Sequence, residues 1–280
     1  MSGRFRSFSF VDRITRREGG RIEGHYTVPL GVHFPASLMA EAVGQLAAWS
    51  SMEQLDFALR PVAGLAGAAH YQQVPKSGCT LQLQADIERC DAEAVAYSGK
   101  AYIDGKLALE LVDSVGPMLP MHEFDAPEAV RGDFHTLLGS GAPADRFGGV
   151  PLPELLDVQL LPGERVGAVL QVPQAAAAPY FADHFPLRPV FPGTLLMDAL
   201  ATLSVQLVQQ SAVLAAAGEL VAKTVSHVKI RSFTAPGTRL QLEAVLQDAD
   251  ALGARLKVTA RGEDKTVASA RIEVTPRSNS

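Results

Sequence analysis

The chain has 280 residues, 47% of them hydrophobic, which suffices for the core of one large domain or of two small ones. Its formal net charge of −5 and its lack of a basic tract argue against nucleic acid as a general partner. The two cysteines, Cys79 and Cys90, have no metal-ligand spacing around them, and residues 1–13 lack the apolar segment of a signal peptide. A reducing, cytoplasmic location is therefore expected.

The first half predicts one helix and an antiparallel sheet. A hairpin-like start with a turn at Gly19-Gly20 precedes a long apolar helix over 37–55. Alternating apolar and polar residues then predict strands near 65–75, 79–90, 93–104 and 106–113. Residues 114–150 are rich in Pro, Gly and Asp, and predict a linker that crosses the surface between a first unit, 1–113, and a second unit, 151–280.

The second half predicts the same succession of elements. A turn at Pro162-Gly163 precedes a helix over 194–216, whose apolar run is interrupted by polar side chains, which favours a buried helix over a membrane span. The predicted strands lie near 221–233, 238–248, 252–262 and 265–274. A helix that is apolar on nearly all sides must be covered on most of them, so each half is expected to be an α+β unit with a sheet curled around its helix.

Two aligned stretches indicate that the halves are duplicates. PASLMAEAVGQL (35–46) lies over PGTLLMDALATL (192–203) at an offset of 157, which matches Glu41 with Asp198. Further on, GCTLQLQADI (78–87) lies over GTRLQLEAVL (237–246) at an offset of 159. Upstream the offset is 144, so the second half has 13 additional residues just before its helix.

The additional residues contain the most specific pattern in the chain, DHFPLRPVFPGTLLMDA (183–199). Its prolines stiffen the loop that carries His184, and the free N–H groups after Gly193, at the start of the predicted helix, can stabilise a negative oxygen. A second HFP, at 33–35, lies over Val190-Phe191-Pro192, so His33 is expected to be a pocket-wall or surface residue.

The pattern H-F-P-x-x-P-x-x-P-G-x-L-x-x-[E/D]-A resembles the motif of the β-hydroxyacyl-acyl-carrier-protein dehydratases, which have a hot-dog fold. The resemblance covers nearly the whole chain twice, apart from the linker, and implies a fused double hot dog. In that family each site takes its histidine from one hot dog and its acid from the helix of the other. The resemblance therefore implies one composite site, with His184 and Gly193 from the second half and Glu41 and Gln45 from the first. Asp198 is the alternative acid.

The resemblance further implies dehydration of (3R)-3-hydroxyacyl thioesters to trans-2-enoyl thioesters in fatty acid or polyketide biosynthesis. The expected partner is acyl carrier protein, which carries the substrate on phosphopantetheine, and no metal or nucleotide cofactor is expected. The unit could pair with a second copy or with another dehydratase. Three alternatives stay open: a hot-dog thioesterase, an enoyl-thioester hydratase or isomerase, and a non-catalytic subunit that binds acyl carrier protein.

Overall fold

The computed structural model describes residues 5, 7–144, 147–151, 154–210, 214 and 218–277. The elements of the first half are β1 (Arg13–Glu18), β2 (Arg21–Thr27), α1 (Ser37–Gln54), β3 (Leu59–Pro61), β4 (Leu65–Tyr71), β5 (Thr80–Cys90), β6 (Ala94–Ile103), β7 (Lys106–Pro120), the 3-10 turn η1 (Met121–Glu123) and α2 (Pro127–Leu138). Those of the second half are β8 (Glu154–Leu161), β9 (Arg165–Gln171), the 3-10 turns η2 (Ala175–Ala177) and η3 (Pro179–Ala182), α3 (Gly193–Gln209), β10 (Leu220–Ile230), β11 (Arg239–Asp250), β12 (Gly253–Arg261) and β13 (Thr266–Pro276).

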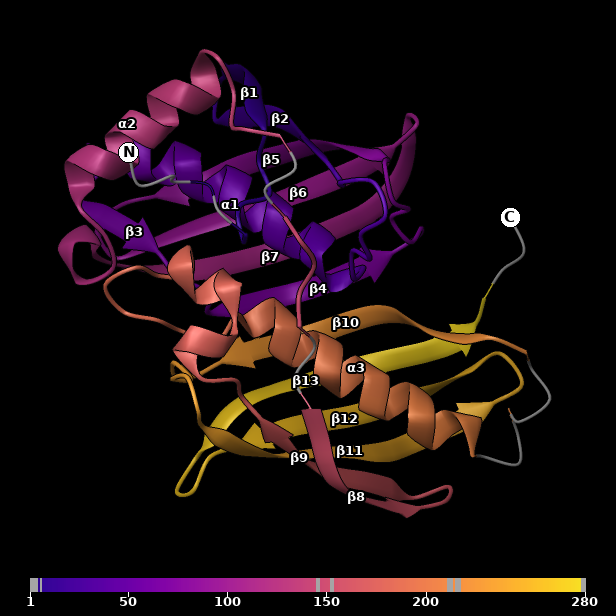
Figure 1. Cartoon of the computed structure of the whole chain (residues 1–280). Coiled ribbons are helices and arrows are strands. Elements are labelled where there is room, and N and C mark those ends of the chain that lie inside the picture. Colours follow the sequence, from indigo (N-terminus) through magenta and orange to yellow (C-terminus); the bar gives the residue numbers. More distant parts are fainter. Residues whose placement is uncertain are drawn as a thin grey trace.

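The strands of both halves form one continuous antiparallel sheet (Figure 1). Its order is β1-β2-β5-β6-β7-β4-β10-β13-β12-β11-β9-β8, and β3 pairs with β7 beside this path. Counted inward from either edge of the sheet, equivalent strands of the two halves follow in the same succession. The two units therefore meet at the β4–β10 pair, where Ala69 lies opposite Val225.

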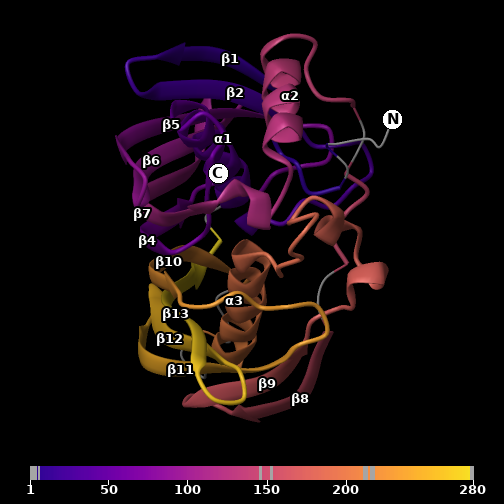
Figure 2. The ribbon, with the colours of Figure 1, turned by 90° about the vertical axis from the view of Figure 1, so that its left-hand side faces the viewer.

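Each half of the sheet curls around its own helix, and the helices lie against the concave side (Figure 2). The alternation of apolar and polar residues in the strands gives each one a buried face, as in β5, whose Leu81, Leu83 and Ala85 are buried. The buried residues of α1 include Leu38, Met39, Ala42, Val43 and Leu46, and those of α3 include Leu195, Leu196, Leu200, Leu203 and Leu207. Both units share one core cluster, so the halves are packed together.

The segment between the two units differs from the expected linker. The strand predicted to end at residue 113 continues as β7 to Pro120. Residues 114–117 pair with β6, and the last three residues pair with β3, a strand that the sequence did not predict. The following helix, α2, buries Val130, Phe134 and Leu137. Phe134 stacks on Trp49 at a ring-centroid distance of 6.1 Å, so α2 covers the C-terminal end of α1.

The two central helices begin close to the predicted positions. The predicted helix 37–55 is α1, and the predicted helix 194–216 is α3, which the structure follows to Gln209. Residues 211–213 and 215–217 of that prediction lie outside the described residues. Among the described residues, no helix is both long and apolar enough to span a membrane.

Candidate active site

The 13 additional residues of the second half form the loop that holds His184. The turn η3 precedes the histidine, and the backbone N–H of His184 donates to the carbonyl of Tyr180 at 2.9 Å. Beyond the histidine, the N–H of Val190 donates to the carbonyl of His184 at 2.9 Å. The loop is also tied to the first half, because the N–H of Leu187 donates to the carbonyl of Phe124 at 3.0 Å.

The ring of His184 is fixed by the same loop. Its Nδ1 lies 2.8 Å from the carbonyl oxygen of Val190. A carbonyl oxygen only accepts, so Nδ1 must carry the proton, and Nε2 of the neutral ring keeps a free lone pair. Burial lowers the pKa of His184, and the nearby charge of Glu41 opposes this shift only in part. The neutral ring, which can act as a base, is thus the favoured form at neutral pH.

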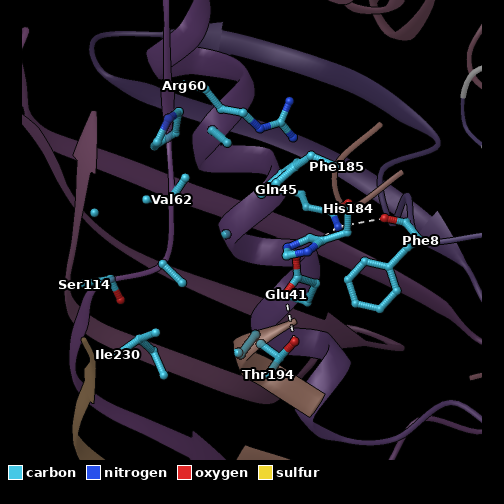
Figure 3. Close-up of a pocket in the computed structure, with 18 of the residues that line it drawn as sticks. Phe8, Glu41, Gln45, Arg60, Val62, Ser114, His184, Phe185, Thr194 and Ile230 are labelled. Atoms are coloured by element: carbon cyan, nitrogen blue, oxygen red, sulfur yellow. Dashed lines mark hydrogen bonds between the residues drawn. The ribbon is translucent and has the colours of Figure 1, made fainter. Parts of the chain in front are cut away.

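Glu41 lies on α1, beside the ring of His184, and both side chains line the cavity (Figure 3). The Nε2 of Gln45, one helical turn later, donates to Oε1 of Glu41 at 3.1 Å. The hydroxyl of Thr194, on α3, donates to Oε2 at 2.7 Å. The two donors keep the carboxyl group of Glu41 in place, and each of its oxygens has a second lone pair for a ligand.

The N-terminal segment closes one side of the site. The amide of Gln45 accepts from the N–H of Phe10 at 2.8 Å and donates to the carbonyl of Phe8 at 3.0 Å. The N–H of Phe8 donates to the carboxylate of Asp183 at 2.8 Å, and its ring lies edge-on to His184 with centroids 5.5 Å apart. The segment thus links the glutamine of the first half to the histidine loop of the second.

These groups line one cavity of about 700 Å³ between the two halves. Its wall contains His184 and Gly193 from the second half, and Glu41 and Gln45 from the first. Gly193 is the first residue of α3, where backbone N–H groups have no acceptor within the helix. The cavity therefore brings together a base, a carboxyl group and helix N-terminal donors.

Asp198 lies in a different setting from Glu41. It does not line the cavity that holds His184. Burial raises the pKa of Asp198, and the hydroxyl of Ser37 and the charge of His33 counteract this shift in part. His33 itself is exposed and is not part of the cavity wall, in keeping with the surface role considered for it. Ser37 is the residue that the 157-residue offset matches with Thr194, so each acid sits beside the hydroxyl at the start of the other half's helix.

Sequence reasoning missed several parts of this site. Thr194 follows Gly193 directly, and its match with Ser37 across the offset was the available signal. Phe8 and Phe10 bind Gln45 through backbone groups, so the identity of their side chains gave no signal of these contacts. Arg60 also lines the cavity, and its guanidinium lies 4.2 Å from the ring centroid of Phe185. Within the described part of the chain, no cluster of three His, Cys, Asp or Glu side chains is arranged to hold a metal ion.

Comparison with known proteins bears on the second half above all. The family model of the ApeI-like dehydratases, described as ApeI dehydratase, matches residues 162–271. A stretch of 73 residues is 36% identical to the 3-hydroxyacyl-[acyl-carrier-protein] dehydratase FabZ of Rickettsia rickettsii, and it covers 26% of this chain and 50% of FabZ. The resemblance to the dehydratases is confirmed. The chain spans about half the length of the curated relatives it matches.

The fold of this chain is shared by solved structures that are named for two activities. The dehydratase domain of a mycocerosic acid synthase-like polyketide synthase covers 100% of both chains with a TM-score of 0.57 and 12% identity. A putative oleoyl thioesterase from Lactobacillus plantarum covers 91% of this chain and 95% of its own, with a TM-score of 0.58 and 10% identity. At such low identity these likenesses show the fold alone, and the predicted double hot dog of class α+β is confirmed.

Proposed function

We propose that the chain is a 3-hydroxyacyl-[acyl-carrier-protein] dehydratase, which converts (3R)-3-hydroxyacyl thioesters into trans-2-enoyl thioesters. The observation that carries the proposal is the position of His184 and Glu41, which face one cavity from different halves of the chain (Figure 3). Acyl carrier protein, with the substrate on its phosphopantetheine arm, is the proposed partner. The match to FabZ supports this choice, because the name of that relative states the same reaction class.

The first part of the proposed reaction is removal of a proton from C2. Nε2 of His184 takes this proton, since Nδ1 is held as a donor to Val190. Negative charge then develops on the thioester oxygen. The N–H groups at the start of α3, where Gly193 lies, stabilise that charge, and the positive end of the helix dipole adds to the effect.

The second part is cleavage of the bond between C3 and its hydroxyl oxygen. Glu41 donates its proton to this oxygen, which leaves as water, and the electrons of the broken C2–H bond form the double bond. The site then contains a protonated His184 and an ionised Glu41. Transfer of the proton from the histidine to the carboxylate restores the starting state, and no other reactant is consumed.

Three variants test the composite site with a 3-hydroxyacyl thioester of acyl carrier protein. His184→Ala and Glu41→Gln should each reduce kcat by about 10²–10⁴-fold, the usual contribution of a general acid or base. Asp198→Asn is the matched control from the other helix and should change kcat by less than about threefold, because Asp198 lies outside the cavity wall. Full activity of Glu41→Gln would refute the composite site.

Product analysis separates dehydration from the alternative activities of the fold. Mass spectrometry of the carrier detects loss of water from the acyl chain if elimination occurs. Hydrolysis, the reaction of a thioesterase, instead frees the carrier thiol and leaves the hydroxy acid intact. A chain that binds the carrier without changing the acyl group would be a non-catalytic subunit. A free thiol as the main product, or an unchanged acyl group, would overturn the proposal.

A further inference from the structure

The floor of the cavity is a band of sheet with small and apolar side chains. Residues directly opposite one another in antiparallel strands point to the same face of the sheet. One row crosses four strands, with Tyr97 on β6 opposite Ser114 on β7, Ser114 opposite Ala66 on β4, and Ala66 opposite Val228 on β10. All four residues line the cavity. The next row contains Leu111, Ala69 and Val225, which are apolar and also line it.

Ser114 interrupts this apolar floor with a hydroxyl group. The residue is only 3% exposed, and among the described residues its Oγ has no partner with normal hydrogen-bond geometry. A buried hydroxyl without a partner is costly, and most buried polar groups in proteins have one. In Figure 3 Ser114 and His184 lie on opposite sides of the view, and both line the cavity. The hydroxyl thus borders the space that a ligand bound at His184 would enter.

Tyr97 brings a second hydroxyl to the same place. Its phenol oxygen reaches α1, where it would lie 3.1 Å from a Cβ added at Gly44, one turn after Glu41. Burial raises the pKa of Tyr97 to about 12, and the charge of Glu41 adds to this shift, whereas the hydroxyl of Ser114 opposes it. The phenol therefore keeps its proton at neutral pH, so it can both donate and accept. Ser114 and Tyr97 lie side by side, but their oxygens do not form a hydrogen bond of normal geometry.

We propose that Ser114 and Tyr97 form a polar subsite for a second oxygen on the acyl chain, a hydroxyl or carbonyl beyond C3. This inference rests on the proposed function and names the substrate class within it. A fully reduced acyl chain would leave the hydroxyl of Ser114 buried and unpaired, whereas an oxygenated chain would satisfy it. Sites built to bind a polar group discriminate against analogues that lack the group for this reason. The reactions that supply the substrate must then leave an earlier oxygen of the chain in place.

The test compares pantetheine thioesters of one chain length. One is the plain 3-hydroxyacyl compound, and the others carry a single carbonyl at successive positions beyond C3. The wild-type chain should prefer at least one oxygenated compound by about tenfold in kcat/KM, the value of one good hydrogen bond. Ser114→Ala and Tyr97→Phe should each reduce that preference to about twofold or less.

Ser51→Ala is the matched control. Ser51 is also a fully buried serine of the first half, but its hydroxyl donates to the carbonyl of Ala47 at 2.9 Å and lies outside the cavity wall. The control should keep the full preference for the oxygenated compound. Thermal unfolding checks the fold, and Ser114→Ala should unfold no earlier than wild type, because it loses a hydroxyl that has no protein partner.

Binding measurements separate this inference from the proposed reaction. Stable thioether analogues of the same chains, titrated calorimetrically, report the subsite even if neither thioester is turned over. Absence of turnover together with a tenfold preference in Kd that Ser114→Ala removes would refute the dehydratase and keep the subsite. Equal Kd values for plain and oxygenated analogues, or a preference that survives in Ser114→Ala, would overturn the subsite.

Discussion

Thr194→Val removes the hydrogen bond by which one half of the chain holds the acid of the other. The change keeps the branched shape of the side chain but deletes the hydroxyl that donates to Oε2 of Glu41 at 2.7 Å. Glu41 becomes a carboxylate as it gives up its proton in the proposed reaction, and hydrogen bonds to charged groups contribute about 1.5–3 kcal/mol. Gln45 still holds the other carboxyl oxygen, so the lower end applies, and about 1.5 kcal/mol corresponds to a roughly tenfold loss in kcat. KM should stay within about twofold.

The assay follows formation of the conjugated enoyl thioester by its ultraviolet absorbance. The control is Ser37→Ala, which removes the hydroxyl at the matching position of α1, beside Asp198 rather than Glu41. This control should change kcat by no more than about threefold. Unchanged kcat in Thr194→Val, or an equal loss in both variants, would refute the view that Thr194 acts on the acid of a single composite site.

Four further predictions concern the same site. In a pH profile of the wild type, kcat/KM should fall as the pH drops through a value below 6.5, because burial lowers the pKa of His184; a midpoint above 6.5 would contradict this. Gln45→Leu should cost about 1–3 kcal/mol of stability and show a reduced Tm, since it leaves the N–H of Phe10 without its acceptor. Asp198→Asn should raise Tm by about 1–3 °C at pH 7. Burial raises the pKa of this carboxyl, so its ionised form destabilises the folded chain at pH values above the pKa in the folded state. This destabilisation is lost as the pH falls through that pKa, and a gain in Tm that grows toward low pH would contradict the prediction. Gly193→Ala should leave Tm unchanged, because the added Cβ meets no atom closer than 3.6 Å, yet reduce kcat/KM by about tenfold as the methyl group crowds the thioester; a parallel loss of Tm would mean a folding defect instead.

The sequence predicted the elements whose apolar residues recur with a clear period, or whose sequence is repeated in the other half. Both central helices and the long strands follow from hydrophobic patterns, and the shift in offset located the loop that carries His184. The sequence also paired that loop with Glu41, but only through the resemblance to a family whose sites are shared between two hot dogs. Spacing alone cannot place two residues 143 positions apart in one cavity.

The features that were missed depend on packing between segments. The linker prediction relied on Pro and Gly content, but α2 is stabilised by its contact with Trp49 and Phe57 rather than by its own composition. β7 continues past residue 113 because β3 supplies a partner for its end. The contact between Thr194 and Glu41 depends on how α1 and α3 pack against one another, and this packing cannot be predicted from a local sequence pattern.

The joining of two units in one chain has a consequence for how such a site can change over generations. In a symmetric dimer of identical subunits, a single substitution in the gene appears at both sites. The fused chain removes this constraint, because Glu41 and Asp198 are encoded separately although they occupy matching positions. The two halves can therefore differ in the loop before the helix and in the acid, as they do in this chain. A position in one half can acquire another side chain without the same change at the matching position of the other half.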